Sequence, residues 1–119
     1  MPNPVVHFEI IGKDGKRLQD FYRQLFAWEV NADNPMNYGM VSAQNDRGIG
    51  GGIASDGSGN GQARVSFYVE VDDLQAYLDK AERLGGKTIM PPTTIPDMVT
   101  LAMFTDPEGN ITGMIKGMS

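Results

Sequence analysis

The sequence has no cysteine and a single histidine, His7, among its 119 residues. Without cysteine there is no disulfide framework, no thiolate nucleophile and no sulfur-ligated zinc or iron–sulfur site. A single imidazole also excludes sites that need two or more histidines from one chain. The lack of cysteine and of a second histidine thus excludes most of the common metal sites and covalent catalytic mechanisms.

Basic residues and long apolar runs are also scarce. Ten Lys and Arg against fifteen Asp and Glu give a net charge of −5, which argues against nucleic acid or an anionic membrane as the main partner. No apolar run approaches the ~18–20 residues that span a bilayer, and the Met-Pro-Asn-Pro start lacks the basic and apolar regions of a signal peptide. We therefore expect a cytoplasmic protein of ordinary globular composition that binds neither nucleic acid nor membrane.

The pattern of apolar residues instead predicts one series of strands and helices that occurs twice. Each half begins with an alternating strand, continues into an amphipathic helix capped by an aspartate, and ends with three further strands. The first half predicts strands at 5–11, 28–32, 38–43 and 48–54, with a turn at 34–37 and a helix from an Asp14 N-cap to about Phe26. The second half predicts strands at 64–71, 87–90, 99–105 and 111–116, and a helix capped by Asp72 or Asp73 and stopped at Gly85 and Gly86.

The fold class that this pattern predicts is α+β, with two β-α-β-β-β units in one domain over residues 1–119. Unit one covers about residues 4–55 and unit two about residues 63–117, and the Gly- and Ser-containing segment 56–61 joins them as a flexible linker. We expect the strands to form a curved mixed sheet around a central cleft.

The first strand of each unit has an apolar face and a more polar face. The apolar, helix-facing sets are Val6, Phe8 and Ile10 in the first unit and Val65, Phe67 and Val69 in the second. The opposite sets are Val5, His7 and Glu9, and Ser66, Tyr68 and Glu70. These polar sets could line a cavity shared by the two sheets, or they could form an exposed sheet face.

His7 and Glu9 are the candidate catalytic residues. Two residues apart on one strand face, they could act as a base and its orienting carboxylate, or form a satisfied polar pair without chemistry. Tyr68 could stack on a ligand or hydrogen-bond it, or could be an ordinary half-buried tyrosine of a sheet.

Apolar candidates for a ligand wall are Trp28, Tyr38, Met40 and Phe104, although a tryptophan at the position of Trp28 is more often a core or interface residue. The glycines at 48–52 lack the Lys-Ser/Thr of a phosphate loop, so we read them as strand glycines that allow close approach at a sheet junction or over a ligand.

Four motifs resemble the vicinal oxygen chelate superfamily, which includes glyoxalase I, extradiol dioxygenases, and fosfomycin- and bleomycin-resistance proteins. The motifs are His-Phe-Glu-Ile at 7–10, Asp-Phe-Tyr-Arg-Gln-Leu-Phe-Ala-Trp at 20–28, Gly-Ile-Gly-Gly-Gly-Ile at 48–53 and Phe-Thr-Asp-Pro-Glu-Gly-Asn at 104–110. The resemblance covers essentially the whole chain and implies the same two-unit fold. It also implies a divalent metal held by side chains on matching strands of the two units.

The metal-ligand positions that the resemblance implies are poorly filled. The first falls on His7, its partner on Ser66, the third within 50–52 and the last on Gly113. Glu9 and Glu70 could offer oxygens beside His7, but they are not at the implied positions. We therefore expect no cofactor; a divalent metal, held by His7 with Glu9 or Glu70, is an alternative that the pattern disfavours.

The predicted function is binding of a small apolar or aromatic molecule in the cleft, as in glyoxalase- and bleomycin-resistance-like proteins. The alternative is a metal-independent lyase or isomerase that moves a proton on a carbonyl compound with His7 as base; a metal-dependent lyase or dioxygenase is disfavoured. The predicted ligand contacts are Ser66, Tyr68, Glu70, Trp28, Tyr38, Met40 and Phe104. A homodimer is expected, because Phe26, Trp28 and the Met-rich strands leave much apolar surface and members of the family of this length commonly pair.

Overall fold

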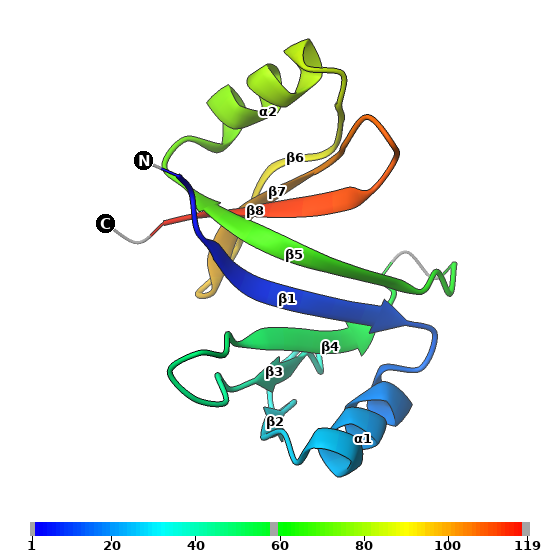
Figure 1. Ribbon diagram of the computed structural model, residues 1–119. Coiled ribbons are helices and arrows are strands. Elements are labelled where there is room, and N and C mark those ends of the chain that lie inside the picture. The colour runs from blue at the N-terminus through cyan, green and yellow to red at the C-terminus, as the bar shows by residue number, and fades with distance from the viewer. Residues whose placement is uncertain (1, 58–59, 118–119) are drawn as a thin grey trace. The chain divides into compact units, whose positions relative to one another are not determined.

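The computed structural model describes residues 2–57 and 60–117 (Figure 1). The chain divides into two compact units: an N-terminal unit of residues 7–65, and a C-terminal unit that joins residues 1–6 to the chain from residue 66 onward. Ser58 and Gly59 of the predicted flexible linker lie outside the described residues.

The first residues of the chain belong with the C-terminal unit, whereas the predicted unit one began at about residue 4. The backbone N–H of Glu70 donates to the carbonyl of Pro4 over 3.0 Å. The amide of Asn3 donates to the carbonyl of Glu70 over 3.1 Å, and the hydroxyl of Tyr77 donates to Asn3 over 3.2 Å. These bonds tie the terminal segment to the first strand and the helix of the C-terminal unit.

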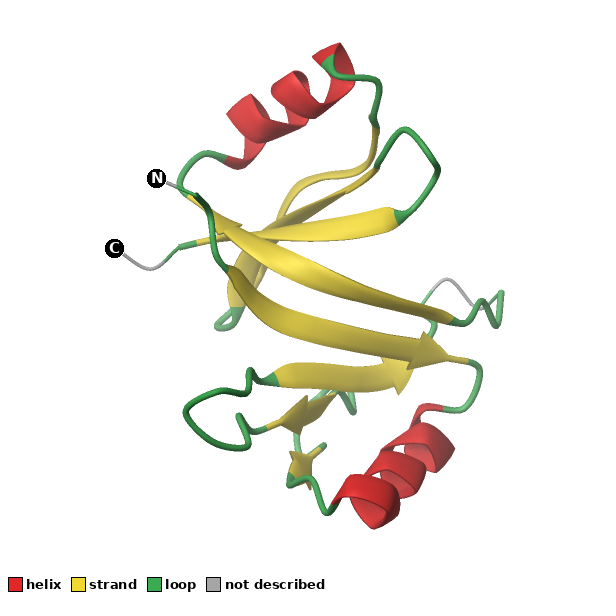
Figure 2. Cartoon of the chain, in the orientation of Figure 1, coloured by secondary structure: helices red, strands yellow, loops and turns green. Residues whose placement is uncertain are grey.

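The N-terminal unit contains one helix and a small mixed sheet (Figure 2). The strand order is β2-β3-β4-β1, with β4 parallel to β1 and the other neighbours antiparallel. Helix α1 packs against β4. The elements are β1 Val5–Gly12, whose first two residues belong to the other unit, α1 Gly15–Phe26, β2 Val30–Asn31, β3 Gly39–Val41 and β4 Gly51–Ser55.

The C-terminal unit repeats the same order of elements. Its strands follow the order β5-β8-β7-β6, with β8 parallel to β5, and helix α2 packs against β6, β7 and β8. The elements are β5 Arg64–Val71, whose first two residues belong to the N-terminal unit, α2 Leu74–Arg83, β6 Lys87–Ile95, β7 Val99–Thr105 and β8 Ile111–Lys116. The predicted α+β class with two β-α-β-β-β units is therefore confirmed.

Both helices begin at the predicted aspartate caps. The Asp14 carboxylate accepts the N–H of Arg17, and the Asp73 carboxylate accepts the N–H of Ala76, each over 3.1 Å. Each bond satisfies one of the donors that the first turn of a helix leaves free. Of the two aspartates proposed for the second cap, Asp73 is the one that caps.

Several strand bounds differ from the predicted ones. The three later strands of the N-terminal unit are shorter than predicted, and β6 continues to Ile95 instead of ending at Met90. Strand β6 lies at the end of the strand order, and its pairing with β7 shifts register around Met90. An edge position with bulges accommodates Pro91 and Pro92, which lack an N–H for a ladder bond. No helix among the described residues is long and apolar enough to cross a membrane.

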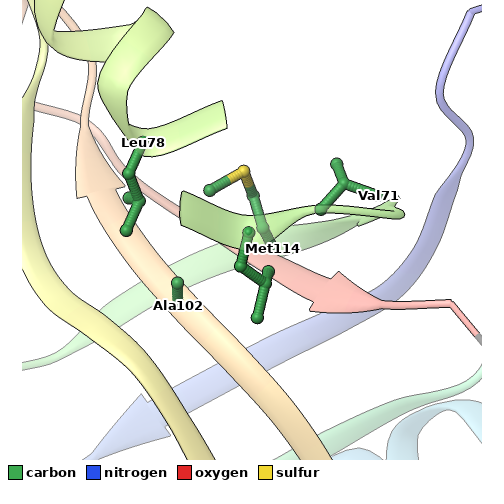
Figure 3. Packing of buried hydrophobic residues seen from close by; sticks show 5 residues of the cluster. Val71, Leu78, Ala102 and Met114 are labelled. Atoms are coloured by element: carbon green, nitrogen blue, oxygen red, sulfur yellow. The ribbon is translucent and has the colours of Figure 1, made fainter. Parts of the chain in front are cut away.

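Each helix covers a compact apolar cluster on its own sheet. In the N-terminal unit Ile10, Val41 and Ile53 are buried, with Phe8, Leu18, Tyr22, Trp28 and Val30 packed against them. Figure 3 shows the corresponding cluster of the C-terminal unit, which consists of Val71, Leu74, Leu78, Ala102 and Met114. Phe8, Ile10 and Val69 thus pack on the helix side of their strands, as predicted.

Two residues of the predicted helix-facing set are exceptions. The exposed fractions of Val65 and Phe67 are 74% and 44%. The buried cluster beneath α2 involves β5 through Val69 and Val71, near the end of the strand that leads into the helix. The alternation of side chains predicts the sheet face on which Val65 and Phe67 lie. It does not predict how much of that face the helix covers.

Candidate functional site

The side chains of the N-terminal unit that carry chemistry form one hydrogen-bonded network. The hydroxyl of Tyr38 lies 2.9 Å from His7 Nε2 and donates to Glu9 Oε2 over 2.9 Å. The other Glu9 oxygen accepts a hydrogen bond and ion pair from Arg64 over 3.1 Å. Only 8% of the Glu9 side chain and 26% of the Arg64 side chain are exposed. A buried carboxylate is thus held by a phenol on one oxygen and a guanidinium on the other.

Local structure brings Tyr38 to this position. His7 and Glu9 share a strand face because side chains alternate along β1. The turn at 34–37, which is confirmed, contains Asn37 with a φ of 52°. The side chain of Asn34 binds the backbone of Tyr38 twice: its amide donates to the Tyr38 carbonyl over 2.7 Å, and its oxygen accepts the Tyr38 N–H over 2.9 Å. The backbone that carries the phenol is therefore anchored before β3 begins.

Gly52 makes room for the phenol. It is the register partner of Glu9 in β1 and of Met40 in β3, so all three lie on the same sheet face. A Cβ atom at Gly52 would lie 1.8 Å from Cζ of Tyr38. The prediction that the strand glycines permit a close approach is confirmed here, and the group that approaches is a side chain of the same unit.

The hydrogen bonds of Tyr38 set the tautomer of neutral His7. The phenol has one proton and donates it to Glu9, so Nε2 of a neutral His7 must donate to Tyr38, and the lone pair of the ring is then on Nδ1. Burial lowers the pKa of His7 below its ordinary value of 6.5, and the negative charge of Glu9 opposes that shift in part. His7 is therefore predominantly neutral near pH 7, the form that a general base requires.

The hydrogen bonds add a residue to the pair that the sequence predicted. Glu9 was expected to orient His7 as its neighbour on the strand, and the Tyr38 hydroxyl bonds to both of them. Tyr38 was expected as part of an apolar wall, yet its hydroxyl is the centre of the network. Arg64 was missed altogether, although alternation along its strand places it on the same face as Ser66 and a buried glutamate requires a cation or several donors.

The C-terminal unit has a second tyrosine over a second glycine. Tyr68 in β5 is the register partner of Gly113 in β8, and a Cβ atom at Gly113 would lie 2.5 Å from Cδ2 of the Tyr68 ring. This ring is 5% exposed and packs with Leu101 and Met103 on the sheet face away from α2. Here the ring fills an apolar core.

Other predicted contacts lie in different surroundings. Ser66 is buried, and among the described residues its Oγ has no hydrogen-bond partner. Glu70 is half-buried at the strand end that binds the terminal segment. The indole of Trp28 stacks on Tyr22, with the ring centres 5.6 Å apart, in the cluster beneath α1.

Trp28 is therefore on the opposite side of the sheet from Met40, and the predicted apolar wall is not formed within the N-terminal unit. In the C-terminal unit Phe104 packs with the cluster beneath α2 and not with Tyr68. The alternation of side chains along one strand could not predict the sheet face on which these residues lie, because each residue comes from a different element. Of the predicted ligand contacts, Tyr38 and Met40 share the sheet face of the candidate catalytic residues His7 and Glu9.

Three of the four metal-ligand positions implied by the resemblance hold a serine or a glycine, which do not suit a metal. A carboxylate-bearing side chain at position 52 or 113 would overlap Tyr38 or Tyr68 respectively. His7 and the Ser66 hydroxyl are the donors left at those four positions. In the described part of the chain, no group of three or more His, Asp or Glu side chains is arranged to hold an ion.

Comparison with known proteins gives a family match over most of the chain. The profile described as Glyoxalase/Bleomycin resistance protein/Dioxygenase superfamily matches residues 5–112. CFP32 of Mycobacterium tuberculosis is 29% identical over 107 residues, which cover 85% of this chain and 41% of CFP32. The anthracycline biosynthesis protein DnrV of Streptomyces peucetius is 27% identical over 123 residues, covering 91% of this chain and 45% of DnrV. The chain thus spans less than half the length of these two relatives.

A solved structure shares the fold at low sequence identity. Methylmalonyl-CoA epimerase of Streptomyces coelicolor, in a complex with 2-nitronate-propionyl-CoA, superposes with a TM-score of 0.68 at 14% identity. The superposition covers all of this chain and 97% of the epimerase chain.

Proposed function

Because the chain belongs to the Glyoxalase/Bleomycin resistance protein/Dioxygenase superfamily, we propose that it binds a small organic molecule without a metal ion. The ligand has an apolar or aromatic body and an oxygen atom, and it contacts the sheet face that carries His7, Tyr38 and Met40. The observation that carries this proposal is the Tyr38 phenol seated over Gly52, with its hydroxyl bonded to both His7 and Glu9.

The physical argument begins with Glu9. A buried carboxylate is costly unless donors neutralise it, and Arg64 and Tyr38 supply those donors. The phenol and imidazole are then fixed in orientation before any ligand arrives, which lowers the entropy cost of binding. Met40, 41% exposed on the same face, offers an adaptable apolar contact for the ligand body. A relative named for anthracycline biosynthesis is in keeping with a small organic ligand.

Binding without a metal is supported by the donor set. Two of the four positions at which the family resemblance implies ligands are glycines covered by tyrosine rings, and a third is a serine. We propose that the rings of Tyr38 and Tyr68 occupy the space that metal-binding carboxylate side chains would need at positions 52 and 113. EDTA should leave the melting temperature of both the wild type and His7→Ala unchanged. An EDTA-induced fall in the wild type that disappears in His7→Ala would contradict this part of the proposal.

Ligand binding is tested by native mass spectrometry of the protein as expressed, followed by identification of any co-purified molecule. A matched probe pair then tests the oxygen contact: 2-naphthol should bind more tightly than naphthalene, which lacks the oxygen. Tyr38→Phe and His7→Gln should each reduce this preference by roughly five- to tenfold, the usual net value of one hydrogen bond. Arg47→Gln, a change at an exposed cation of the same unit, is the control. Equal binding of the two probes, or a preference insensitive to both variants, would contradict the proposal.

A second candidate function is proton transfer at a carbon next to a carbonyl group, with His7 as the base. The observation that favours it is the neutral imidazole, with Nε2 bonded to Tyr38 and its lone pair on Nδ1. In this reaction Nδ1 accepts the α-proton, an enolate forms, and the proton returns to the same carbon. Incubation with acetophenone-type ketones such as hydroxyacetophenone in D2O should then replace the α-hydrogens by deuterium, as read by NMR. The rate should rise with pH through the lowered pKa of His7 and level off above it, and His7→Gln should abolish it.

A further inference from the structure

The N-terminal unit has a concave surface whose lining does not include His7, Glu9 or Tyr38. A groove of about 670 Å³ lies between the first half of α1, the end of β1 and the start of β5. Its walls include Ile10, Leu18, Phe21 and Val65, whereas His7 and Tyr38 are not among its lining residues. Ile10 and Leu18 belong to the cluster beneath α1, so the groove opens on the helix side of the sheet.

The groove leaves large apolar side chains in contact with water. Val65 is 74% exposed and Phe21 is 55% exposed, although both line a concave surface and not a convex one. The volume falls within the roughly 300–1,000 Å³ of typical small-molecule pockets. Covering these walls with an apolar ligand body would remove hydrophobic surface from water, which is favourable in proportion to the area covered.

The charged residues at the rim of the groove indicate which polar group a ligand with an apolar body should carry. Lys13 and Arg17 line it, and within residues 2–57 and 60–117 neither is part of an ion pair. The remaining cation, Arg64, is already paired with Glu9. The single carboxylate in the lining, Asp14, accepts the N–H of Arg17 as the cap of α1. In a chain of net charge −5, Lys13 and Arg17 outnumber the single lining carboxylate, Asp14, and this local excess of positive charge beside an apolar groove favours a negatively charged occupant.

We propose that this groove binds a small amphipathic anion, with an aliphatic or aromatic body against Phe21 and Val65 and a carboxylate facing Lys13 and Arg17. The occupant is a small molecule with one acidic group, such as a medium-chain fatty acid. This proposal does not rest on the proposed function at His7, and its test separates the two.

The test compares decanoate with decanol in calorimetric titrations, with contacts mapped by NMR. Decanoate should bind more tightly than decanol and should shift the backbone signals of residues 10–22 and 63–65. Lys13→Gln combined with Arg17→Gln should weaken decanoate binding by roughly fivefold, the upper range for exposed charge pairs, and leave decanol within about twofold. Higher salt should reduce the decanoate preference because the rim is exposed.

Further variants distinguish an effect on the apolar wall of the groove from a loss of folding and from an effect at the His7 site. Val65→Glu, at a position too exposed to affect the core, should abolish decanoate binding by like charge. Leu84→Ser, an equally exposed apolar position in the other unit, should have no effect, and neither should His7→Gln.

The proposal is overturned if decanoate and decanol bind equally, if neither binds, or if His7→Gln abolishes the binding. It is also overturned if sedimentation shows a dimer that Val65→Glu dissociates, because the groove would then be an interface between copies of this chain.

Discussion

Each unit has a tyrosine over a strand glycine, but the two tyrosines come from different strands and have different surroundings. Tyr38 lies over Gly52 with its hydroxyl bonded to His7 and Glu9, whereas Tyr68 lies over Gly113 in an apolar cluster and is 5% exposed. In each unit the glycine pairs with the first strand: Gly52 with Glu9 and Gly113 with Tyr68. The absence of a Cβ atom at each glycine thus leaves space for a polar network in one unit and for core packing in the other.

The largest difference is expected from truncating the two rings. Tyr68→Ala should lower the free energy of unfolding by about 3–5 kcal/mol, the usual cost of removing a buried aromatic ring. Tyr38→Ala should cost much less because the ring is only half-buried, but it should remove the 2-naphthol preference. Denaturant unfolding and probe titration of the two variants provide the comparison. Equal losses of stability would show that the two rings have the same structural role.

Adding a methyl group beneath each ring sharpens the comparison. Gly113→Ala should cost about 1–3 kcal/mol because the buried Tyr68 ring cannot move aside. At Gly52 the nearest atoms are the far end of the Tyr38 side chain, so Gly52→Ala should turn the phenol outward at a smaller cost in stability. The hydrogen bonds to His7 and Glu9 would be lost with it. A Gly52→Ala variant that keeps full probe binding would refute the role assigned to Tyr38.

Removing the cation of the polar network should also cost stability. Arg64→Gln takes away a charged hydrogen bond from Glu9 and should lower the free energy of unfolding by about 1–3 kcal/mol. Arg47→Gln, at an exposed position, should change it by less than about 0.5 kcal/mol. Chemical denaturation of both variants gives the difference directly. If the two variants are equally stable, the Glu9–Arg64 pair does not hold the network together.

The smallest effect is the pH dependence that His7 contributes. Its pKa is lowered on folding, so the unfolded chain binds more protons at pH values between the folded pKa and 6.5. This contribution to stability is complete above 6.5 and is lost as the pH falls toward the folded pKa. The wild type should therefore lose more stability than His7→Gln between about pH 7.5 and pH 5.5. Identical pH profiles would mean that His7 has the same pKa in both states.

The repeat of elements was predictable because it depends on local patterns. Alternation over 64–71 and the caps Asp14 and Asp73 are encoded within a few neighbouring residues, and those elements formed as expected. The shared face of His7 and Glu9 follows from the same alternation.

What escaped prediction was contact between distant segments. The Tyr38 hydroxyl reaches Glu9 across 29 positions and Arg64 reaches it across 55, and no pattern within either segment specifies the partner. The one local signal was the glycine at 52, which indicated a close approach without naming the approaching side chain. The way α2 covers only part of β5, leaving Phe67 exposed, was likewise set by packing and not by alternation.

The most direct test of the account uses the fact that the chain has one histidine. Long-range 1H–15N NMR spectra report the tautomer and the pKa of that single imidazole without assignment ambiguity. Neutral His7 should carry its proton on Nε2 and titrate below 6.5, with spectra unchanged by EDTA. Tyr38→Phe should alter the tautomer balance, while Tyr68→Phe should not. A proton on Nδ1, a pKa at or above 6.5, or an EDTA-sensitive signal would contradict a metal-free site organised by Tyr38.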